Sequence, residues 1–286
     1  MQKRPVAVVT GASSGFGMLT SVALAEAGYM VISTMRNPEL RDPLDKLAMT
    51  KNVSDFIEVI PLDVTSEEQI VSAVSTIIAS HHQIDLLVNN AGYACGGFVE
   101  ELSAKQWRKQ FDVNVFGVID VTRAVLPYMR EKQNGTIINL SSISGRFGFP
   151  GLAPYAASKH AIEGFSESLR LEMLPYNVHV VLIEPGSYRT TIWDKGIRET
   201  IVHPLSPYAA QTKQMISYVN KIKQQAPDPA EVVSLIVRAA TTPKPRLRYP
   251  VGRGVGFTLL AKSLLPWKWI EYFVRTKGIS PGSDSD

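Results

Sequence analysis

The stretch PVAVVTGASSGFG, residues 5–17, joins an apolar, β-branched run to a turn rich in glycine. The run at 5–10 predicts a buried strand, and residues 18–28 predict a helix that ends at Gly28. A strand, a glycine turn and a helix N-terminus predict a phosphate-binding loop, because backbone N–H groups point outward there and the helix dipole favours an anion. An ordinary turn of small residues is the alternative, and the preceding strand favours phosphate binding.

The glycines of this loop, Gly11, Gly15 and Gly17, are spaced Gly-x-x-x-Gly-x-Gly. The usual dinucleotide fingerprint is Gly-x-Gly-x-x-Gly, so the loop does not match it. Nucleotide-sugar epimerases and dehydratases, whose glycines are spaced G-x-x-G-x-x-G, are disfavoured for the same reason.

Further along the chain, short apolar segments alternate with amphipathic ones. The apolar segments predict strands at Tyr29–Thr34, Phe56–Leu62, Ile84–Asn89, Gly135–Leu140, Val178–Ile183 and Leu247–Val251. The amphipathic segments predict helices at Asp42–Met49, Ser66–His81, Ser103–Lys132, Tyr155–Pro175 and Pro229–Thr241. Together they predict an α/β fold, a doubly wound parallel sheet of seven strands with helices on both faces. A ligand is then expected at the carboxyl ends of the strands.

Composition bounds the class of protein. The 286 residues fit one large α/β domain. The net charge is +4 with Lys and Arg scattered along the chain, which argues against a nucleic-acid partner. Cys95 is the single cysteine, so no internal disulfide forms, and the sequence contains no cluster of metal ligands. The N-terminus leads directly into the first strand without a signal peptide, so we expect a cytoplasmic protein. Because the sequence has no cluster of metal ligands, we also expect that it binds no metal.

Tyr155 and Lys159 are four residues apart in a predicted helix, so both side chains lie on one helix face. A free phenol titrates near ~10, and a neighbouring cation favours the phenolate, so we expect a lowered pKa for Tyr155. The pair is a candidate general acid/base. The alternative is a chance pair on a solvated helix, which only the surrounding motifs can exclude.

Six motifs, taken in order, resemble those of the short-chain dehydrogenase/reductase family. They are TGASSGFG at 10–17, NNAG at 89–92, Asn114 in DVNV, Ser142 thirteen residues before the tyrosine, Tyr155 with Lys159, and PGSYRT at 185–190. The resemblance covers residues 5–190 and continues more faintly to about 252. It implies a Rossmann-like fold in a single domain. The segments LPYNV at 174–178 and EPG at 184–186 look most like the hydroxysteroid and retinol dehydrogenase branch.

The resemblance implies a role for each motif residue. Tyr155 would exchange a proton with the substrate oxygen, and Lys159 would favour the phenolate and bind the nicotinamide ribose. Ser142 would hydrogen-bond the substrate oxygen, and Asn114 would connect Lys159 to solvent through a water chain. The residues expected to bind the cofactor are Gly11, Ser13, Ser14, Gly15, Phe16, Gly17, Arg36, Asp63, Val64, Asn90, Ala91, Gly92, Tyr155, Lys159, Pro185, Gly186 and Thr190.

The residues after the second predicted strand bear on the choice between NAD and NADP. Relatives that prefer NAD usually carry an acidic residue there, where this chain has Met35. Arg36 follows and offers a charged fork that suits a 2′-phosphate. We therefore predict NADP(H), with NAD as the weaker alternative.

The substrate side is expected at about 187–225, which contains large apolar residues and poor strand or helix signals. Those residues are Tyr188, Ile192, Trp193, Ile197, Ile201, Val202, Tyr208, Met215 and Tyr218. We interpret the segment as a mobile lid over an apolar pocket, with simple core filling as the alternative. A small lipophilic alcohol or carbonyl compound is the expected substrate.

The C-terminus departs from the family. We assign 1–254 to the NADP-binding domain with its lid, and 255–286 to an apolar helical extension with a disordered tail. Pro266 and interspersed charges argue against a bilayer span. Three interpretations remain for 255–275: an extra helix over the substrate mouth or a subunit interface, a partner-docking helix, or a membrane-surface helix.

The sequence thus predicts an NADP(H)-dependent oxidoreductase that interconverts an alcohol and a ketone or aldehyde. A catalytically silent NADP-binding sensor or scaffold is the alternative, disfavoured because Asn114, Ser142, Tyr155 and Lys159 are all present. The resemblance further implies a homo-oligomer that associates through the helices predicted at Ser103–Lys132 and Tyr155–Pro175.

Overall fold

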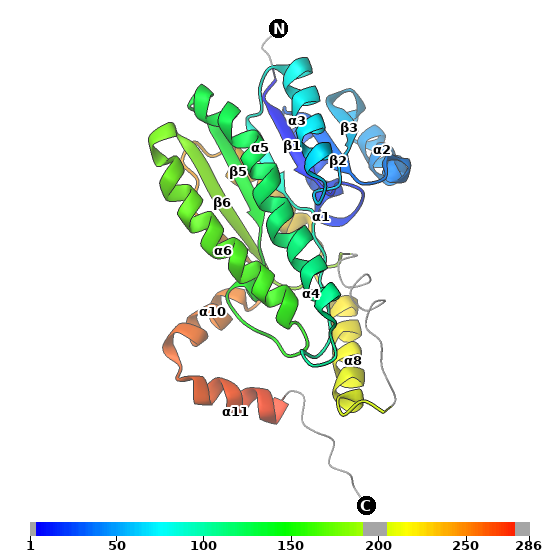
Figure 1. The fold of residues 1–286 in the computed structure, drawn as a ribbon, viewed down its shortest axis with the longest axis vertical. Coiled ribbons are helices and arrows are strands. Elements are labelled where there is room, and N and C mark those ends of the chain that lie inside the picture. Colours follow the sequence, from blue (N-terminus) through cyan, green and yellow to red (C-terminus); the bar gives the residue numbers. More distant parts are fainter. Residues whose placement is uncertain (1–3, 191–204, 278–286) are drawn as a thin grey trace, which may run out of the picture.

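The computed structural model describes residues 4–190 and 205–277. Its seven-stranded sheet is parallel throughout, in the order β3-β2-β1-β4-β5-β6-β7 (Figure 1). The strands are β1 (Val6–Thr10), β2 (Met30–Met35), β3 (Ile57–Pro61), β4 (Leu86–Asn89), β5 (Gly135–Leu140), β6 (Val178–Pro185) and β7 (Arg248–Val251). The predicted α/β fold, a doubly wound parallel sheet in one domain, is confirmed.

The strand order reverses beside β1. Val8 of β1 pairs with Ile32 of β2 on one side and with Leu87 of β4 on the other. All five residues of β1 are buried, as the continuous apolar run predicted. The chain continues from β1 to β2 on one side and from β4 to β5 on the other. A crevice therefore forms at the carboxyl ends of β1 and β4.

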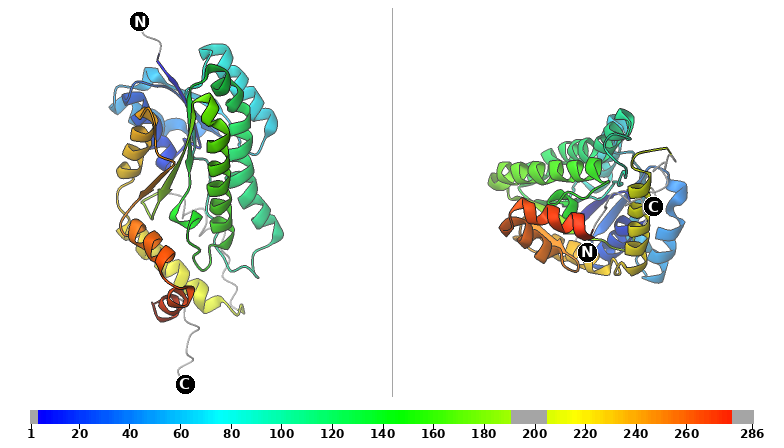
Figure 2. Two further views of the ribbon diagram at one scale, coloured as in Figure 1. Left: turned by 90° about the vertical axis from the view of Figure 1, so that its left-hand side faces the viewer. Right: turned by 90° about the horizontal axis from the view of Figure 1, so that it is seen from below.

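Helices cover both faces of the sheet, as the views in Figure 2 show. One face carries α1 (Gly15–Glu26), α2 (Asp42–Thr50) and α9 (Ala230–Thr241). The other carries α3 (Glu67–His81), α5 (Gly117–Lys132) and α6 (Ala153–Met173). The remaining short elements are α4 (Ala104–Phe111), η1 (Pro38–Arg41), η2 (Ser54–Phe56), η3 (Asp112–Phe116), η4 (Ile143–Gly145) and η5 (Leu174–Tyr176). Each helical layer buries its own apolar core against the sheet.

The predicted unbroken helix over Ser103–Lys132 is wrong in one detail. It is divided into α4, the π-helical turn η3 and α5. A π turn widens a helix locally and is frequent at functional sites. Here the wider turn contains Asn114, whose side chain bonds the backbone of Tyr93.

The segment predicted at 187–225 to lack clear helix signals contains the helix α8 (Ala209–Gln225). Its buried residues Thr212, Met215 and Val219 recur at helical spacing, a period that explains the helix. Residues 191–204, which include the apolar Ile192, Trp193, Ile197, Ile201 and Val202 of the predicted lid, lie outside the described residues.

Two helices follow β7 at the C-terminal side: α10 (Val255–Leu264) and α11 (Trp267–Lys277). They lie at the end of the molecule where the strands have their carboxyl ends (Figure 1). No helix in the described part of the chain is both long and apolar enough to cross a bilayer. The division at residue 254 stays a prediction, and residues 278–286 lie outside the described part.

Candidate active site

A pocket of about 460 Å³ lies at the carboxyl ends of the strands. Residues that follow six of the seven strands line it, from Gly11 after β1 to Gly186 after β6. Of the nineteen residues predicted for the site, seventeen line the pocket, and only Gly17 and Asn114 do not. The motifs are thus brought together although they span almost two hundred residues of sequence.

The glycine loop forms one wall. Gly11 has φ +70°, and a Cβ there would lie 2.8 Å from the Cα of Ala91. The loop after β1 and the loop after β4 are therefore too close for any side chain at residue 11. Gly15 has φ +59° and begins α1, whose first turn carries no acidic side chain. Backbone N–H groups at the N-terminus of a helix donate hydrogen bonds to an anion, and here no acidic side chain in the first turn would repel it. This arrangement fits the pyrophosphate of a dinucleotide.

Gly17 acts by packing. A Cβ at Gly17 would lie 2.4 Å from both the Nδ2 of Asn90 and the carbonyl oxygen of Gly11. The same Asn90 Nδ2 donates to the carbonyl oxygens of Thr10, at 2.8 Å, and Gly11, at 3.1 Å. Only glycine lets α1 approach this cross-link, so Gly17 sets the position of the loop without lining the pocket.

Tyr155, Lys159 and Ser142 form the other end of the pocket. Tyr155 and Lys159 lie one turn apart on α6, with the Lys159 Nζ 5.7 Å from the centroid of the Tyr155 ring. Lys159 Nζ donates to the carbonyl oxygen of Leu140 at 2.6 Å. Ser142 follows β5, and its side chain hydrogen-bonds that of Tyr155. The hydroxyl of Ser142, the phenol of Tyr155 and the ammonium of Lys159 therefore lie together in the pocket that the glycine loop also lines.

The expected lowering of the Tyr155 pKa is wrong for this structure. Burial raises the pKa of Tyr155 to about 12, because a phenolate loses its hydration, and the hydrogen bond from Ser142 only partly opposes this. Lys159 is directed to the Leu140 carbonyl rather than to the phenol oxygen. Tyr155 therefore carries its proton at neutral pH.

Burial lowers the pKa of Lys159 to about 8, and the negative charge of Glu163 opposes that fall. Glu163 lies one turn after Lys159 on α6 and is itself buried. Its Oε1 accepts from the hydroxyl of Ser141 at 2.5 Å. Glu163 was not predicted from the sequence, although the spacing 155, 159, 163 places it on the same helix face.

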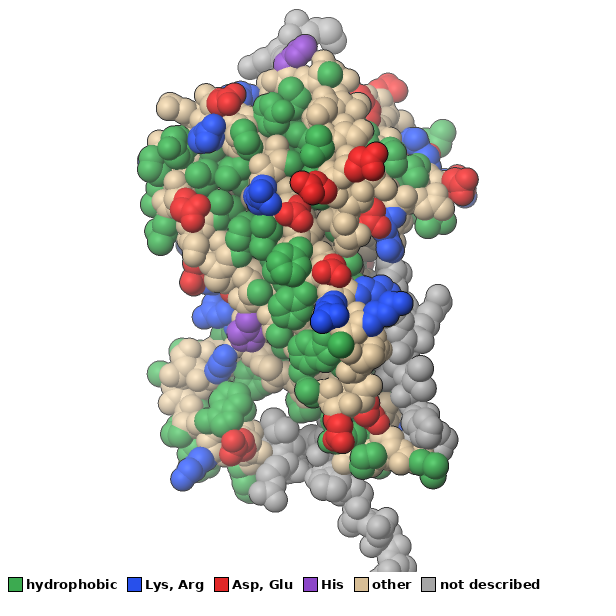
Figure 3. Space-filling view, in the orientation of Figure 1, with side chains coloured by type: hydrophobic (Ala, Val, Ile, Leu, Met, Phe, Trp, Pro, Cys, Tyr) green, Lys and Arg blue, Asp and Glu red, His purple; other side chains and the backbone are tan. Residues whose placement is uncertain are grey.

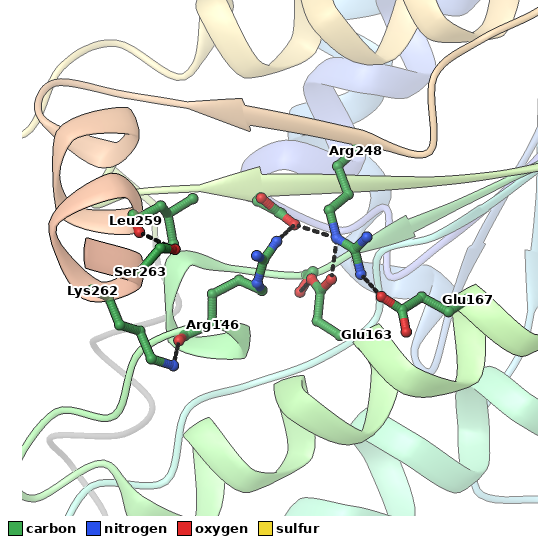
Figure 4. Close-up of polar contacts among 9 residues, drawn as sticks. Arg146, Glu163, Glu167, Arg248, Leu259, Lys262 and Ser263 are labelled. Carbon is green, nitrogen blue, oxygen red and sulfur yellow. Dashed lines mark hydrogen bonds and ion pairs between the residues drawn. The ribbon is translucent and has the colours of Figure 1, made fainter. Parts of the chain in front are cut away.

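A charged cluster connects β6 and β7 to α6 (Figure 4). Arg248 of β7 contacts Glu163 at 3.0 Å, Glu167 at 2.5 Å and Glu184 at 3.1 Å. Arg146 contacts Glu184 at 3.3 Å. Burial and the neighbouring charge of Glu163 raise the pKa of Glu184 to about 7, which fits a carboxyl group with one buried oxygen lacking a hydrogen bond.

Asn114 supports the site from outside the pocket. Its Oδ1 accepts from the backbone N–H of Tyr93 at 3.1 Å, and its Nδ2 donates to the Tyr93 carbonyl at 2.9 Å. Nδ2 also lies 3.4 Å from the hydroxyl of Ser158, the residue before Lys159. Asn114 thus joins the loop after β4 to α6, and its water chain to Lys159 stays a prediction.

The far end of the pocket contains the residues predicted to distinguish the cofactors. Met35 is the last residue of β2 and Arg36 follows it, and Arg36 is exposed at the pocket edge. Asp63 and Val64 follow β3, and Asp63 accepts from the backbone and hydroxyl of Thr65, which fixes the turn. The two residues at the end of β2 that line the pocket, Met35 and Arg36, are not acidic, and Asp63 after β3 is the acidic residue in this lining.

Eight pocket residues were absent from the predicted catalytic and cofactor-binding residues, although Tyr188 was among those expected on the substrate side. They are Met35, Leu62, Tyr93, Lys109, Val113, Leu140, Ser141 and Tyr188. Tyr188 is buried, its hydroxyl donates to Glu231 at 2.6 Å, and its ring contacts that of Phe16. Most of them immediately precede or follow a predicted motif, which is the signal that could have found them. Over the described residues, no three His, Cys, Asp or Glu side chains are placed to hold a metal ion.

A family model described as short chain dehydrogenase matches residues 5–200. The chain belongs to the short-chain dehydrogenase family. It is 49% identical over 277 residues to the uncharacterized oxidoreductase YusZ of Bacillus subtilis, covering 96% of this chain and 98% of that protein. It is 33% identical over 271 residues to a 3-ketodihydrosphingosine reductase of Bacteroides thetaiotaomicron, covering 94% and 96%.

Human retinol dehydrogenase 8 is 32% identical over 256 residues, covering 84% of this chain and 79% of that protein. The predicted hydroxysteroid and retinol dehydrogenase branch is confirmed. Among solved structures, a short-chain dehydrogenase from Streptomyces avermitilis superposes with a TM-score of 0.79 at 33% identity, covering 99% of this chain and 100% of that one. The actinorhodin polyketide ketoreductase with NADPH gives a TM-score of 0.73 at 29% identity, covering 90% and 98%. The short-chain dehydrogenase is therefore an oxidoreductase that uses a nicotinamide cofactor and acts on CH–OH groups.

Proposed function

We propose that this short-chain dehydrogenase is an NADP(H)-dependent enzyme that interconverts a lipophilic alcohol and its ketone or aldehyde. The observation that carries the proposal is the convergence of Ser142, Tyr155 and Lys159 in the pocket that the glycine loop also lines. When bound, the nicotinamide supplies or accepts the hydride. The protein's own residues handle the proton and hold the substrate oxygen.

Tyr155 is the proton donor to the carbonyl oxygen. Because burial raises the pKa of Tyr155 to about 12, the phenol is protonated at neutral pH and can serve as the acid when a carbonyl is reduced. Ser142, hydrogen-bonded to Tyr155, holds the same substrate oxygen. The ammonium of Lys159 stabilises the phenolate that remains after proton transfer.

We propose NADP(H) over NAD because Arg36 lies at the pocket edge where the sequence has no acidic residue. A guanidinium binds a phosphate with two parallel hydrogen bonds, whereas an acidic residue there would repel it. The actinorhodin ketoreductase, similar in fold, is described with NADPH, which supports the proposal. Serine dehydrogenase with NADP+, at 28% identity, supports it as well.

Replacing Arg36 tests this preference. Arg36→Ala is expected to raise KM for NADPH about tenfold and to leave KM for NADH nearly unchanged, since one charge-assisted hydrogen bond is worth ~1.5–3 kcal/mol and Arg36 is exposed. The matched control is Arg41→Ala, because Arg41 is five residues further along the chain, pairs with Asp45 and does not line the pocket. A wild-type enzyme that prefers NADH would contradict the assignment.

Glu163→Gln tests the role of a protonated Lys159. The Glu163 carboxylate raises the pKa of Lys159, so its removal lowers that pKa below about 8. If the ammonium form is active, kcat/KM falls as pH rises through the Lys159 pKa. We therefore expect the alkaline limb of the profile to move to lower pH in the variant, measured from pH 5 to 10.

The control for this variant is Glu167→Gln. Glu167 shares Arg248 with Glu163 but is half-exposed and does not contribute to the pKa of Lys159. A general loss of packing would lower activity at every pH in both variants. The alkaline limb staying in place in Glu163→Gln, or moving equally in both, would refute the role of the Lys159 charge.

We propose a lipophilic substrate because aromatic and apolar side chains gather around the catalytic end. Tyr93, Val113 and Tyr188 line the pocket there, and the buried Met215 of α8 lies against Gly151. The 3-ketodihydrosphingosine reductase and retinol dehydrogenase 8 are named for lipophilic substrates, which supports this class.

A substrate panel tests the proposed function. Purified protein is mixed with NADPH and each of a series of long-chain ketones, aldehydes and polyol or sugar carbonyls, and the absorbance of the reduced cofactor is followed. We expect consumption with the lipophilic carbonyls and little with the polar ones. Cofactor binding without turnover on any carbonyl would favour the silent sensor or scaffold instead.

We further propose a cytoplasmic protein that forms a homo-oligomer. The single cysteine, Cys95, is buried, which fits a reducing compartment. Phe116, the last residue of η3 before α5, is 54% exposed and Leu171 of α6 is 68% exposed. Such apolar side chains on the two helices expected to associate support an interface between copies.

A further inference from the structure

The helices α10 and α11 carry a concentrated apolar surface. Seven of the seventeen exposed large hydrophobic side chains that the described residues contain lie between 257 and 272. Phe257, Leu260 and Leu264 are 77%, 58% and 72% exposed, and their spacing of three and four residues places them in one stripe of α10. We call these three residues the outer stripe. Trp267, Trp269 and Tyr272 of α11 are exposed to 55%, 56% and 60%.

The opposite side of α10 packs against the body of the protein, beside the pocket. Val255 is buried, and a Cβ on the pocket residue Gly186 would lie 2.9 Å from its side chain. Two turns later, the Nζ of Lys262 donates to the backbone carbonyl of Arg146 (Figure 4). These contacts set the rotation of α10 about its axis, so the outer stripe faces away from the body.

The positive charge of the protein is concentrated in the same segment. Basic residues are scattered along the chain, but acidic residues balance them outside 253–277. That segment contains Arg253, Lys262, Lys268, Arg275 and Lys277 against Glu271, a net charge of +4. The whole chain also has a net charge of +4, from 30 basic and 26 acidic residues, so the other 25 basic and 25 acidic residues cancel.

We propose that α10 and α11 bind the surface of an anionic phospholipid bilayer, with the outer stripe and Trp269 inserted at the level of the headgroups, whereas the ring of Trp267 packs against Phe147. An amphipathic helix with basic residues beside Trp, Phe and Leu has the composition of an interfacial helix, and neither apolar area nor charge alone gives stable binding. Figure 3 shows hydrophobic side chains beside Lys and Arg at the lower left, where Figure 1 places these helices.

The charge of this segment also argues against a second copy of the chain as the partner that covers α10 and α11. Two copies that met through this face would bring together two segments of +4 each, and like charges repel at close range. An anionic lipid surface attracts the same segment, and each Lys or Arg contributes. Lipid is therefore the partner that satisfies both the apolar stripe and the charge.

The bound bilayer would lie next to the pocket, because Val255 contacts the pocket residue Gly186 at the start of α10. A lipophilic molecule dissolved in the bilayer could then reach the pocket without crossing water. Only this consequence rests on the proposed function; the membrane contact itself does not.

The test uses the full chain and vesicles of two compositions. Purified protein is sedimented with pure phosphatidylcholine vesicles and with vesicles containing one third phosphatidylglycerol. We expect binding at least tenfold stronger to the anionic vesicles, with a blue shift of tryptophan emission, and weaker binding as salt rises. Equal binding to both vesicles, or none to either, would overturn the proposal.

A matched pair of triple variants locates the contact. Phe257→Ser, Leu260→Ser and Leu264→Ser together should lower vesicle binding at least tenfold, with NADPH-binding affinity unchanged as evidence of folding. The control replaces Leu40, Met49 and Val71 by Ser, which are 59%, 69% and 56% exposed on other parts of the surface. Equal loss in both variants would refute the role of the stripe. A stripe variant that turns a soluble dimer into a monomer without changing vesicle binding would assign the face to a second copy instead.

Discussion

Tyr155→Phe is expected to lower kcat by a factor on the order of 10²–10⁴, the usual contribution of a positioned general acid. The variant keeps the ring, which is 6% exposed and packed on α6, and loses only the hydroxyl that hydrogen-bonds Ser142. Nucleotide binding should therefore stay within a few-fold of wild type, because the glycine loop and Lys159 are unchanged. Turnover is followed by nicotinamide absorbance, and binding by quenching of protein fluorescence.

The control for Tyr155→Phe is Tyr176→Phe, which removes a phenol oxygen from a side chain that is 37% exposed and does not line the pocket. This control should keep wild-type kcat. A Tyr155→Phe enzyme with near-normal kcat would show that another group supplies the proton. A variant that also loses nucleotide binding would point to a folding defect.

Gly17→Ala is expected to damage the cofactor loop more than any other single methyl group. The new Cβ would lie 2.4 Å from the Gly11 carbonyl oxygen, a backbone atom that cannot rotate away, and equally close to Asn90. Overpacking of this kind costs ~1–3 kcal/mol, and the loop that moves is the one that lines the pocket. We expect a lower Tm and at least a tenfold loss of NADPH affinity.

Gly164→Ala is the matched control, because Gly164 also lies inside a helix but a Cβ there meets nothing within 4 Å. That change should leave affinity intact and raise stability by ~0.4–1 kcal/mol, since alanine reduces the freedom of the unfolded chain. The packing role of Gly17 would be wrong if Gly17→Ala kept both the Tm and the NADPH affinity of wild type.

The sequence predicts the sheet and the site well where the signal is local. The apolar run at 5–10 gives β1 because a strand buried on both faces needs no alternation, and the glycine loop follows it directly. Motifs such as NNAG and PGSYRT lie at strand ends, so the parallel sheet brings them to one edge. This is why seventeen of nineteen predicted residues line one pocket.

What depends on distant pairing could not be predicted. Arg248 contacts Glu163 from 85 residues away, and neither periodicity nor spacing indicates that pair. The pKa of Tyr155 was predicted to fall, because the sequence gives the nearby Lys159 but not the depth of burial, which dominates. The helix α8 was missed although Thr212, Met215 and Val219 have helical spacing, since the polar residues around them weaken the pattern.

The location of isotope in the product tests the proposed chemistry most directly. Wild-type enzyme reduces the best carbonyl of the panel with NADPH that carries deuterium at both positions of C4 of the nicotinamide, and the product alcohol is analysed by NMR. We expect one deuterium on the carbinol carbon, and a yield of labelled alcohol in the same time that is lower with Tyr155→Phe by a factor on the order of 10²–10⁴. Product alcohol without deuterium at that carbon, or equal labelled product from both enzymes, would contradict hydride transfer assisted by Tyr155.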